Sequence, residues 1–303
     1  MVYSHGPRAF CVPIDYGLWT IDYRCRMAFF DRFLRKAARE PLRDVAGLTA
    51  HLAVPALRLM LADVGARSHV GGQPGLTPGA VWPSHEGTPL GFLARLSLAD
   101  IHAVQPMPWL PDSGALLFFY DIEQQPWGFD PADRGGWSVL HVDDLQLPAV
   151  APAATSSVAP TVPFRYVRFD PIQSRPSQER DEVAILKLND AESEELMRIS
   201  DAPFANGPKH QVGGFPSPIQ SDEMEVEAQL ASNGVYWGDG SGDPVKRAAL
   251  APGAAEWRLL LQFDSDEHLD LMWGDSGTIY FWVRAQAARR GDFQDAWLVL
   301  QCY

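Results

Sequence analysis

Apolar residues gather in short runs that are separated by turn-forming segments along most of the chain. Runs of this length, rich in β-branched and aromatic residues, are typical of strands. The nearly all-apolar run Ala115–Tyr120 predicts a strand that is buried on both faces. The other predicted strands are Val54–Leu61, Phe92–Leu98, Trp137–Val142, Phe164–Phe169, Glu256–Phe263, Thr278–Arg284 and Trp297–Cys302.

Helical periodicity is confined to a few segments. In Met27–Val45 the apolar residues recur at intervals of three and four, which predicts an N-terminal helix. Asp100–Val104 predicts a short helical turn and Ala191–Ile199 a helix. Ser221–Ala231 predicts a further helix, with Ser221 as its N-cap and Asn233-Gly234 as its stop signal.

Glycine and proline support a fold of many short elements. The chain has 25 Gly and 25 Pro among 303 residues, which argues against a bundle of long helices. Residues 148–163 contain only Ala, Pro, Ser, Thr and Val, which indicates a linker or a long surface loop. The predicted fold class is therefore α+β, with mainly antiparallel sheets.

Three short patterns occur twice and in the same order. They are the Gly-Gly loops at 69–74 and 210–216, the strands 92–96 and 259–263, and the Asp-Ser-Gly turns at 112–114 and 275–277. This order predicts an internal duplication that gives two related β-rich lobes, packed as one unit and preceded by the N-terminal helix. The predicted boundaries are 1–66 for the N-terminal segment, 67–147 for the first repeat, 148–163 for the linker and 164–303 for the second repeat.

The charge balance limits the partners that we expect. Twenty-five Lys and Arg against 38 Asp and Glu give a net charge of −13, which argues against nucleic acids and against anionic membranes. A basic protein partner or a small-molecule ligand stays open. The N-terminus lacks the apolar region of a signal peptide, and no apolar run reaches membrane-spanning length. Cys11, Cys25 and Cys302 have no CxxC spacing, so we expect reduced thiols in the cytoplasm.

Motifs from about Gly71 to the C-terminus resemble the YwqG-like family, a bacterial domain of unknown function. They include Trp82-Pro83, residues 89–94, residues 259–266 and Met272-Trp273-Gly274-Asp275-Ser276-Gly277. The sequence departs from the family where Arg95 replaces a common Gln, and in the insertion at 148–163. The resemblance implies a mixed, mostly antiparallel α/β fold, and it implies no activity.

The Asp-Ser-Gly sequence is also found around the nucleophile of trypsin-like proteases. Its occurrence before a strand in both predicted repeats instead favours a turn. The stretch from Asp264 and Asp266 through Asp270 to Asp275 places acidic groups at calcium-loop spacing, but the required Gly and Glu are missing. A solvated acidic loop is the favoured interpretation, and a divalent metal site at Asp264, Asp266 and Asp275 is the alternative. No cofactor motif is present, and we predict no cofactor.

Polar residues within or beside apolar strands are the candidates for ligand binding. Buried polar groups need partners, and these side chains can satisfy loops of the opposite repeat or line a cleft between the lobes. The candidates are His69, Arg95, His210, Gln211, Gln262, Asp264, Asp266 and Trp273. We therefore expect a non-catalytic cytoplasmic binding or protein-interaction protein. The alternative is a hydrolase that uses an acidic cleft at Asp264, Asp266 and Asp275, with or without a metal.

Overall fold

The computed structural model of the chain divides it into two units, Met1–Leu42 and Arg43–Tyr303. The structure describes residues 43–303, apart from 66, 77–79, 144–160, 206 and 239–241. Residues 27–42 of the predicted helix Met27–Val45 and residues 148–160 of the predicted linker 148–163 lie outside the described residues. The helix α2 (Val45–Thr49) is the first described element, and Asp44 caps it by accepting a hydrogen bond from the Gly47 N–H.

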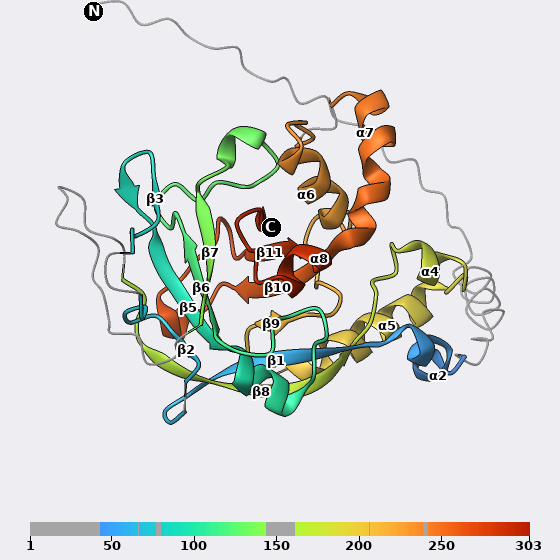
Figure 1. Cartoon of the computed structure of the whole chain (residues 1–303). Coiled ribbons are helices and arrows are strands. Elements are labelled where there is room, and N and C mark those ends of the chain that lie inside the picture. Colours follow the sequence, from blue (N-terminus) through green and yellow to red (C-terminus); the bar gives the residue numbers. More distant parts are fainter. Residues whose placement is uncertain (1–42, 66, 77–79, 144–160, 206, 239–241) are drawn as a thin grey trace, which may run out of the picture. The chain divides into compact units, whose positions relative to one another are not determined.

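A ten-stranded antiparallel sheet forms the frame of the described unit, in the order β12-β11-β10-β9-β1-β8-β2-β5-β6-β7 (Figure 1). Its strands are β1 (Val54–Ala62), β2 (His69–Val70), β5 (Gly91–Ser97), β6 (Ala115–Tyr120), β7 (Trp137–Val142), β8 (Arg165–Ser174), β9 (Gln211–Val212), β10 (Trp257–Asp264), β11 (Thr278–Arg284) and β12 (Trp297–Gln301). A separate hairpin pairs β3 (Ser84–His85) with β4 (Thr88–Pro89). These elements confirm the predicted α+β class with antiparallel sheets.

The long strands β1 and β8 form the middle of the sheet. They pair from Val54 opposite Ser174 to Ala62 opposite Tyr166. Beyond β1 the order continues as β9-β10-β11-β12, and beyond β8 as β2-β5-β6-β7. Each central strand therefore pairs outward with strands that lie far from it in the sequence.

We call the strands beyond β1 (β9, β10, β11 and β12) and those beyond β8 (β2, β5, β6 and β7) the two wings of the sheet. The wings pack against each other through aromatic rings. Phe118 of β6 meets Phe281 of β11 with ring centroids 5.2 Å apart, and Trp137 meets Trp297 at 4.9 Å. The Trp137 indole N–H donates to the Ala296 carbonyl, 2.9 Å away. Because these rings are almost completely buried, the outer strands of the two wings share one apolar core.

The outer edge of β12 is covered by residues 127–128. The Leu300 N–H donates to the Trp127 carbonyl at 2.9 Å, and the Trp297 indole N–H donates to the Gly128 carbonyl at 2.6 Å. Gly128 has φ +85°, and a Cβ on it would meet the Leu298 carbonyl oxygen at 1.7 Å. A glycine is therefore required for this close approach.

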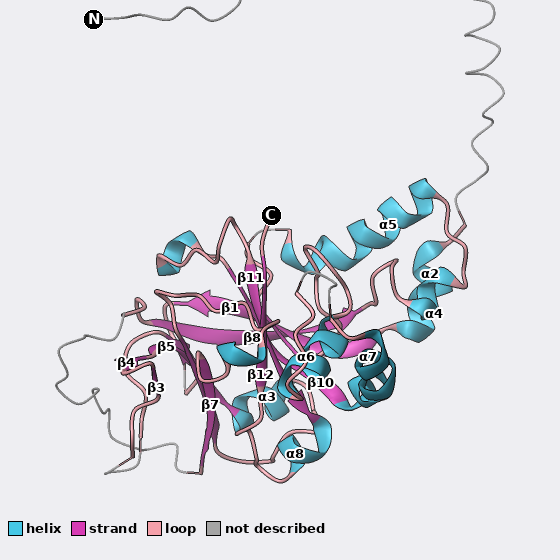
Figure 2. Ribbon diagram, turned by 90° about the horizontal axis from the view of Figure 1, so that it is seen from above, coloured by secondary structure: helices cyan, strands magenta, loops and turns pink. Residues whose placement is uncertain are grey.

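Helices lie around the sheet in two groups. The helices α4 (Asp181–Ala184) and α5 (Asp190–Asp201) lie with α2 at one end, and α6 (Met224–Ser232) and α7 (Pro244–Leu250) lie side by side in a second group (Figure 2). The short helices α3 (Leu98–Val104) and α8 (Ala285–Arg289) follow β5 and β11 directly. Asn189 and Glu192 form a capping box that fixes the start of α5.

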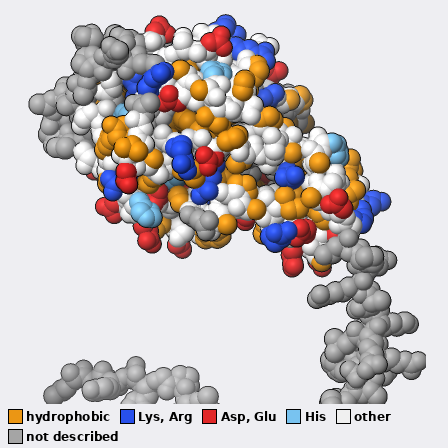
Figure 3. Space-filling model, turned by 90° about the horizontal axis from the view of Figure 1, so that it is seen from below, with side chains coloured by type: hydrophobic (Ala, Val, Ile, Leu, Met, Phe, Trp, Pro, Cys, Tyr) orange, Lys and Arg blue, Asp and Glu red, His pale blue; other side chains and the backbone are white. Residues whose placement is uncertain are grey.

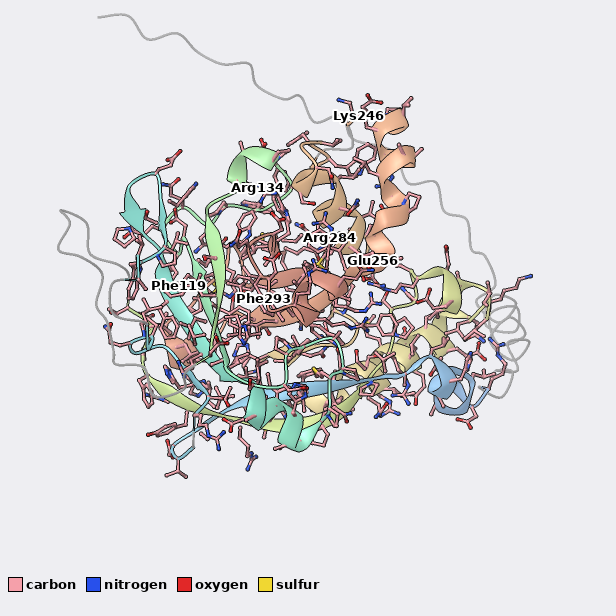
Figure 4. The ribbon with its side chains drawn as sticks, viewed as in Figure 1. Phe119, Arg134, Lys246, Glu256, Arg284 and Phe293 are labelled. Carbon is pink, nitrogen blue, oxygen red and sulfur yellow. The ribbon has the colours of Figure 1, made fainter. Side chains whose placement is uncertain are left out.

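Two arginines connect the α6 region to the sheet (Figure 4). The Arg134 guanidinium lies 4.8 Å from the Trp297 ring centroid, and the Arg284 guanidinium lies 4.4 Å from that of Trp257. Burial, and to a smaller extent the charge of Arg134, lowers the pKa of Arg284. Arg284 also donates to Gln229 and Ser232 of α6, so these side chains tie helix to sheet.

Most predicted elements are confirmed, and two differ. Helix α6 begins at Met224, and Ser221 is not its N-cap: the residue in that position is Glu223, whose side chain makes no capping bond. The Ser221 carbonyl instead accepts a hydrogen bond from Gln301, and its hydroxyl accepts one from the Glu223 N–H. Strand β8 continues five residues beyond the predicted Phe169, to Ser174, because β1 pairs with it over its full length.

Candidate functional site

His210 precedes β9 and connects three segments. Its Nδ1 accepts a hydrogen bond from the Asp264 N–H at 3.0 Å, so this nitrogen carries no proton. Its Nε2 therefore holds the proton and donates to the Asp266 carboxylate at 3.2 Å. The ring also stacks on Phe263 at 4.5 Å. These contacts hold a neutral, buried imidazole in one tautomer.

The Asp266 carboxylate accepts hydrogen bonds on both oxygens. Besides His210, it accepts from the His268 N–H at 2.8 Å and lies 3.0 Å from the His268 ring nitrogen Nδ1. Burial raises the pKa of this carboxyl, but the hydrogen bonds from the two histidines outweigh burial and lower the pKa to about 2. Asp266 also caps the short helix η5 (Glu267–Leu269), so it fixes the turn that follows β10.

Asp264 ends β10 and holds the backbone at Lys209. One carboxylate oxygen accepts from the Lys209 N–H at 2.9 Å. The other accepts from the Thr278 hydroxyl at 2.7 Å and from the Ser265 N–H at 3.1 Å. Both oxygens of this carboxylate therefore serve contacts within the fold.

Gln262 and Gln211 act on the same stretch of chain. The Gln262 amide donates to the Lys209 carbonyl at 2.6 Å and accepts from the Ser217 N–H at 2.8 Å. The Gln211 amide donates to the carbonyls of Gly213 and Phe215. Tyr280 adds a hydrogen bond to the Ser217 carbonyl at 2.7 Å, and burial raises the pKa of this phenol.

Most of these bonds fix one segment, Lys209–Ile219, which we call the wall segment. Gln301 holds its far end by accepting from the Ile219 N–H at 2.9 Å. Ser174 at the end of β8 both donates to and accepts from the Phe215 backbone. His210, Gln211, Gln262, Asp264 and Asp266 are thus brought together around the wall segment, whereas Trp273 makes no hydrogen bond to it.

The wall segment forms one side of a cavity of about 340 Å³. The end of β8 and the residues after it form the floor, and α5 and η3 (Ala202–Phe204) form the opposite side. Leu196, Phe204 and Phe215 give this cavity an apolar surface, while Gln211, Lys209 and Arg175 bring polar groups to it. A volume above about 300 Å³ is typical of small-molecule sites.

His69 and Arg95 lie together on the other side of the central strand pair. They are paired residues of β2 and β5. The His69 ring contacts the Gly71 carbonyl at 2.9 Å, and burial lowers the pKa of this imidazole against the opposing effect of that contact. In the sheet order β1 and β8 lie between β2 and β9, and neither His69 nor Arg95 lines the cavity beside the wall segment.

Trp273 is fully buried and contacts the rings of Tyr120 and Phe263. It belongs to the core between the wings, and its indole N–H has no hydrogen-bond partner among the described residues. The side chain of Asp275 is exposed, and the Asp275 carbonyl accepts from the Tyr303 N–H.

Within the described ranges, no group of three or more His, Cys, Asp or Glu is placed to hold a metal ion. The contacts of Asp264 and Asp266 are those of structural carboxylates. The metal site and the hydrolase therefore stay predictions that no contact described above favours.

Arg175, Lys209 and α5 line the cavity but were not among the predicted site residues. Arg175 follows β8 in a Ser-Arg-Pro-Ser stretch that resembles an ordinary surface loop. The one available signal is the position of Lys209 directly before the candidates His210 and Gln211. Only the tertiary fold brings α5 over the end of β8.

The described unit is thus an α+β protein with a ten-stranded antiparallel sheet and a cavity beside its central strands. The family described as "Domain of unknown function (DUF1963)" matches residues 68–302, and the chain belongs to this family. A comparison with curated proteins found no match.

No helix in the described part of the chain has both the length and the apolar character needed to cross a bilayer. On the face shown in Figure 3, Lys and Arg side chains alternate with Asp, Glu and apolar side chains, and they form no continuous basic stripe there.

Proposed function

We propose that this protein is a non-catalytic binding protein that holds a small molecule in the cavity beside the wall segment. The observation that supports it best is the convergence of polar contacts on one segment. Lys209 is an example: Asp264 accepts a hydrogen bond from its N–H, Gln262 donates one to its carbonyl, and Asp201 accepts one from its ammonium group at 2.6 Å. Such preorganisation reduces the entropy that a binding site loses when its ligand enters.

Binding of a neutral apolar fluorophore, N-phenyl-1-naphthylamine, tests this proposal with the full chain. We expect saturable binding that Ser193→Trp weakens by at least about tenfold, because Ser193 lines the cavity and an indole there would fill it. Glu194→Trp is the matched control, since Glu194 is the next residue of α5, is exposed and lies outside the lining. Absence of saturable binding, or equal loss in both variants, would refute a binding cavity at this place.

We further propose that the chain arose by internal duplication, as the repeated motifs predict. Two observations support this. Both Gly-Gly pairs adopt left-handed backbone conformations, with φ +58° and +72° at Gly71 and Gly72, and +70° and +76° at Gly213 and Gly214. The strand order is also the same on either side of the β1–β8 pair.

A pair of equivalent hydrogen-bond relays adds support for duplication. At the end of β5, the Ser97 N–H donates to the Ser68 hydroxyl, which donates to the Asp100 carboxylate. At the end of β10, the Asp264 N–H donates to His210, which donates to Asp266. In both places the middle residue directly precedes the short strand that leads into the Gly-Gly loop.

The narrower assignment to YwqG-like proteins and the cytoplasmic location also stay proposals. The first rests on the motifs quoted above. The second rests on the cysteine pattern, and Cys302 is a free, buried thiol.

A further inference from the structure

Arg175 differs from the other charged groups of the cavity. The ammonium of Lys209 is paired with Asp201, so these two charges offset each other. Arg175 makes no ion pair within the described residues, and its Nε atom is buried without a hydrogen-bond partner there. A guanidinium stays charged at any physiological pH, so the cavity lining carries a positive group that the described chain does not neutralise.

A neighbouring arginine shows what a structural role would require. The Arg180 guanidinium donates to Asp222 at 2.8 and 2.6 Å and to Glu225 at 2.9 Å, and it lies 5.1 Å from the Phe215 ring centroid. Those contacts raise the pKa of Arg180 against the opposing effect of burial. Arg180 thus packs on the Phe215 ring and lies outside the cavity lining, while Arg175 lines the cavity itself.

Glu179 is the one Asp or Glu side chain of the lining outside the Lys209–Asp201 pair, and it is exposed. Water screens an exposed charge far better than a buried one. Arg175 is only partly exposed and has no ion-pair partner among the described residues, so its charge is less screened than that of Glu179.

The apolar lining defines the rest of the ligand. Leu196 and Phe204 are buried, and Phe215 is half-buried with its ring held by Arg180. Met197 lines the cavity although 58% of it is exposed, and Met side chains adapt to varied apolar shapes. A ligand with an apolar body would cover these side chains.

We propose that the cavity selects a small organic anion with an apolar body, and that Arg175 binds its carboxylate or phosphate group. This inference rests on the proposed function, because it names the class of ligand for the same cavity. Arginine suits either anion, since its planar N–H groups can form two parallel hydrogen bonds to it.

Displacement of the bound fluorophore tests this proposal. The competitors are decanoate, decyl phosphate, decanol and decyltrimethylammonium, all below their micelle-forming concentrations. We expect the two anions to compete at least about tenfold more strongly than decanol, and the cation to compete most weakly. A difference between decanoate and decyl phosphate identifies which acid group the site prefers.

Substitution of Arg175 assigns the preference to this residue. Arg175→Gln should reduce the advantage of the anions over decanol to within about twofold, and Arg175→Lys should keep part of it. Arg168→Gln is the matched control, because Arg168 lies on β8, is exposed and lies outside the lining. The wild-type comparison of anions with decanol stands even if a variant does not fold.

The outcomes separate the two proposals. Equal competition by anions, alcohol and cation would overturn the anion site and leave the binding cavity in place. An anion preference that survives Arg175→Gln would place the anion elsewhere and would also overturn this inference. Failure of the fluorophore to bind the wild-type chain refutes the proposed function itself.

Discussion

At the scale of single residues, hydrogen bonds decide what the candidate site does. His210 and Asp266 resemble the base and carboxylate of a catalytic pair, yet both ring nitrogens of His210 are engaged within the fold. A general base needs a free nitrogen within reach of its substrate. The pair therefore stabilises the position of the wall segment, a role that we call the brace. Its loss should lower the stability of the fold directly and weaken ligand binding as a consequence.

Asp266→Ala should lower the free energy of unfolding by on the order of 2 kcal/mol, because it leaves the buried His210 Nε2–H without its acceptor. Fluorophore binding should weaken as the wall segment loosens. Urea unfolding and fluorescence titration measure the two effects. Asp275→Ala is the control, because that side chain is exposed, and it should change neither. Equal effects of the two substitutions would contradict the brace.

The same residue predicts a pH dependence. The pKa of Asp266 is about 2 in the folded chain, below the value of an unfolded aspartate at about 4. Its stabilisation is thus fully present above about pH 4 and is lost as the pH falls toward 2. The stability difference between the wild type and Asp266→Ala should shrink over that range in urea titrations. A stability difference that stays constant between pH 4 and 2 would contradict the lowered pKa of Asp266.

Glu227 of α6 should make stability depend on pH in the opposite direction. Burial raises its pKa to about 7, and the charge of Glu223 adds to the effect. The folded chain then holds a proton that the unfolded chain releases near pH 4, so stability falls as the pH rises from about 4 to 7. Glu227→Gln should remove this loss and raise the melting temperature at pH 8 but not at pH 4. A melting temperature raised equally at both pH values would argue against titration of Glu227.

At the scale of elements, loops adjacent to the sheet position the cavity. Gly214 has φ +76°, and a Cβ on it would lie 2.7 Å from the Cβ atoms of Ala56 and Ser174. The glycine lets the wall segment approach the ends of β1 and β8, where Ser174 binds the Phe215 backbone. A side chain at this position would push the wall segment away from the cavity floor.

Gly214→Ala should therefore destabilise the chain more than backbone strain alone explains. Gly234→Ala is the matched control, because Gly234 has φ +79° but nothing lies within 4 Å of a Cβ there. We expect about 1 kcal/mol for the control, from the left-handed conformation, and clearly more for Gly214, together with weaker fluorophore binding. Thermal unfolding compares the two, and equal losses would show that the close contact is relieved without cost.

Elements were easier to predict than the site. Strands such as Ala115–Tyr120 and Thr278–Arg284 appear with their predicted bounds, because a strand buried on both faces needs a continuous apolar run. The two-residue strands β2 and β9 were missed because they are too short for any periodicity. The polar candidates His210, Gln262 and Asp264 were found because buried polar groups are rare, but their roles depend on the atoms that they face. Arg175 could not be found, since only the fold places α5 over it.

At the scale of the whole described unit, the central strand pair makes the two halves interdependent. Strand β1 comes from the N-terminal half, but it pairs with β8 and β9 of the C-terminal half. Strand β8 in turn pairs with β2 of the N-terminal half. Neither half can satisfy the backbone of its own first strand alone.

We therefore expect one cooperative unfolding transition, with coincident curves from circular dichroism and Trp fluorescence. Two fragments produced by cutting between residues 144 and 160 should lack fixed tertiary structure separately, as near-ultraviolet circular dichroism reports. Mixing them should restore the native spectrum. A fragment that folds alone would contradict this interdependence and would favour two autonomous domains.

The cover over β12 has a consequence for the behaviour of this protein in crowded solution. An uncovered edge strand can recruit a strand from another molecule, which is the first step of ordered aggregation. Here Trp127 and Gly128 occupy the position where such a strand would add, and Gly128 fits only because it has no side chain. A bulkier residue at 128 would lift this cover and expose Leu298–Leu300. Gly128 thus allows the cover that keeps the β12 edge from pairing with strands of other molecules.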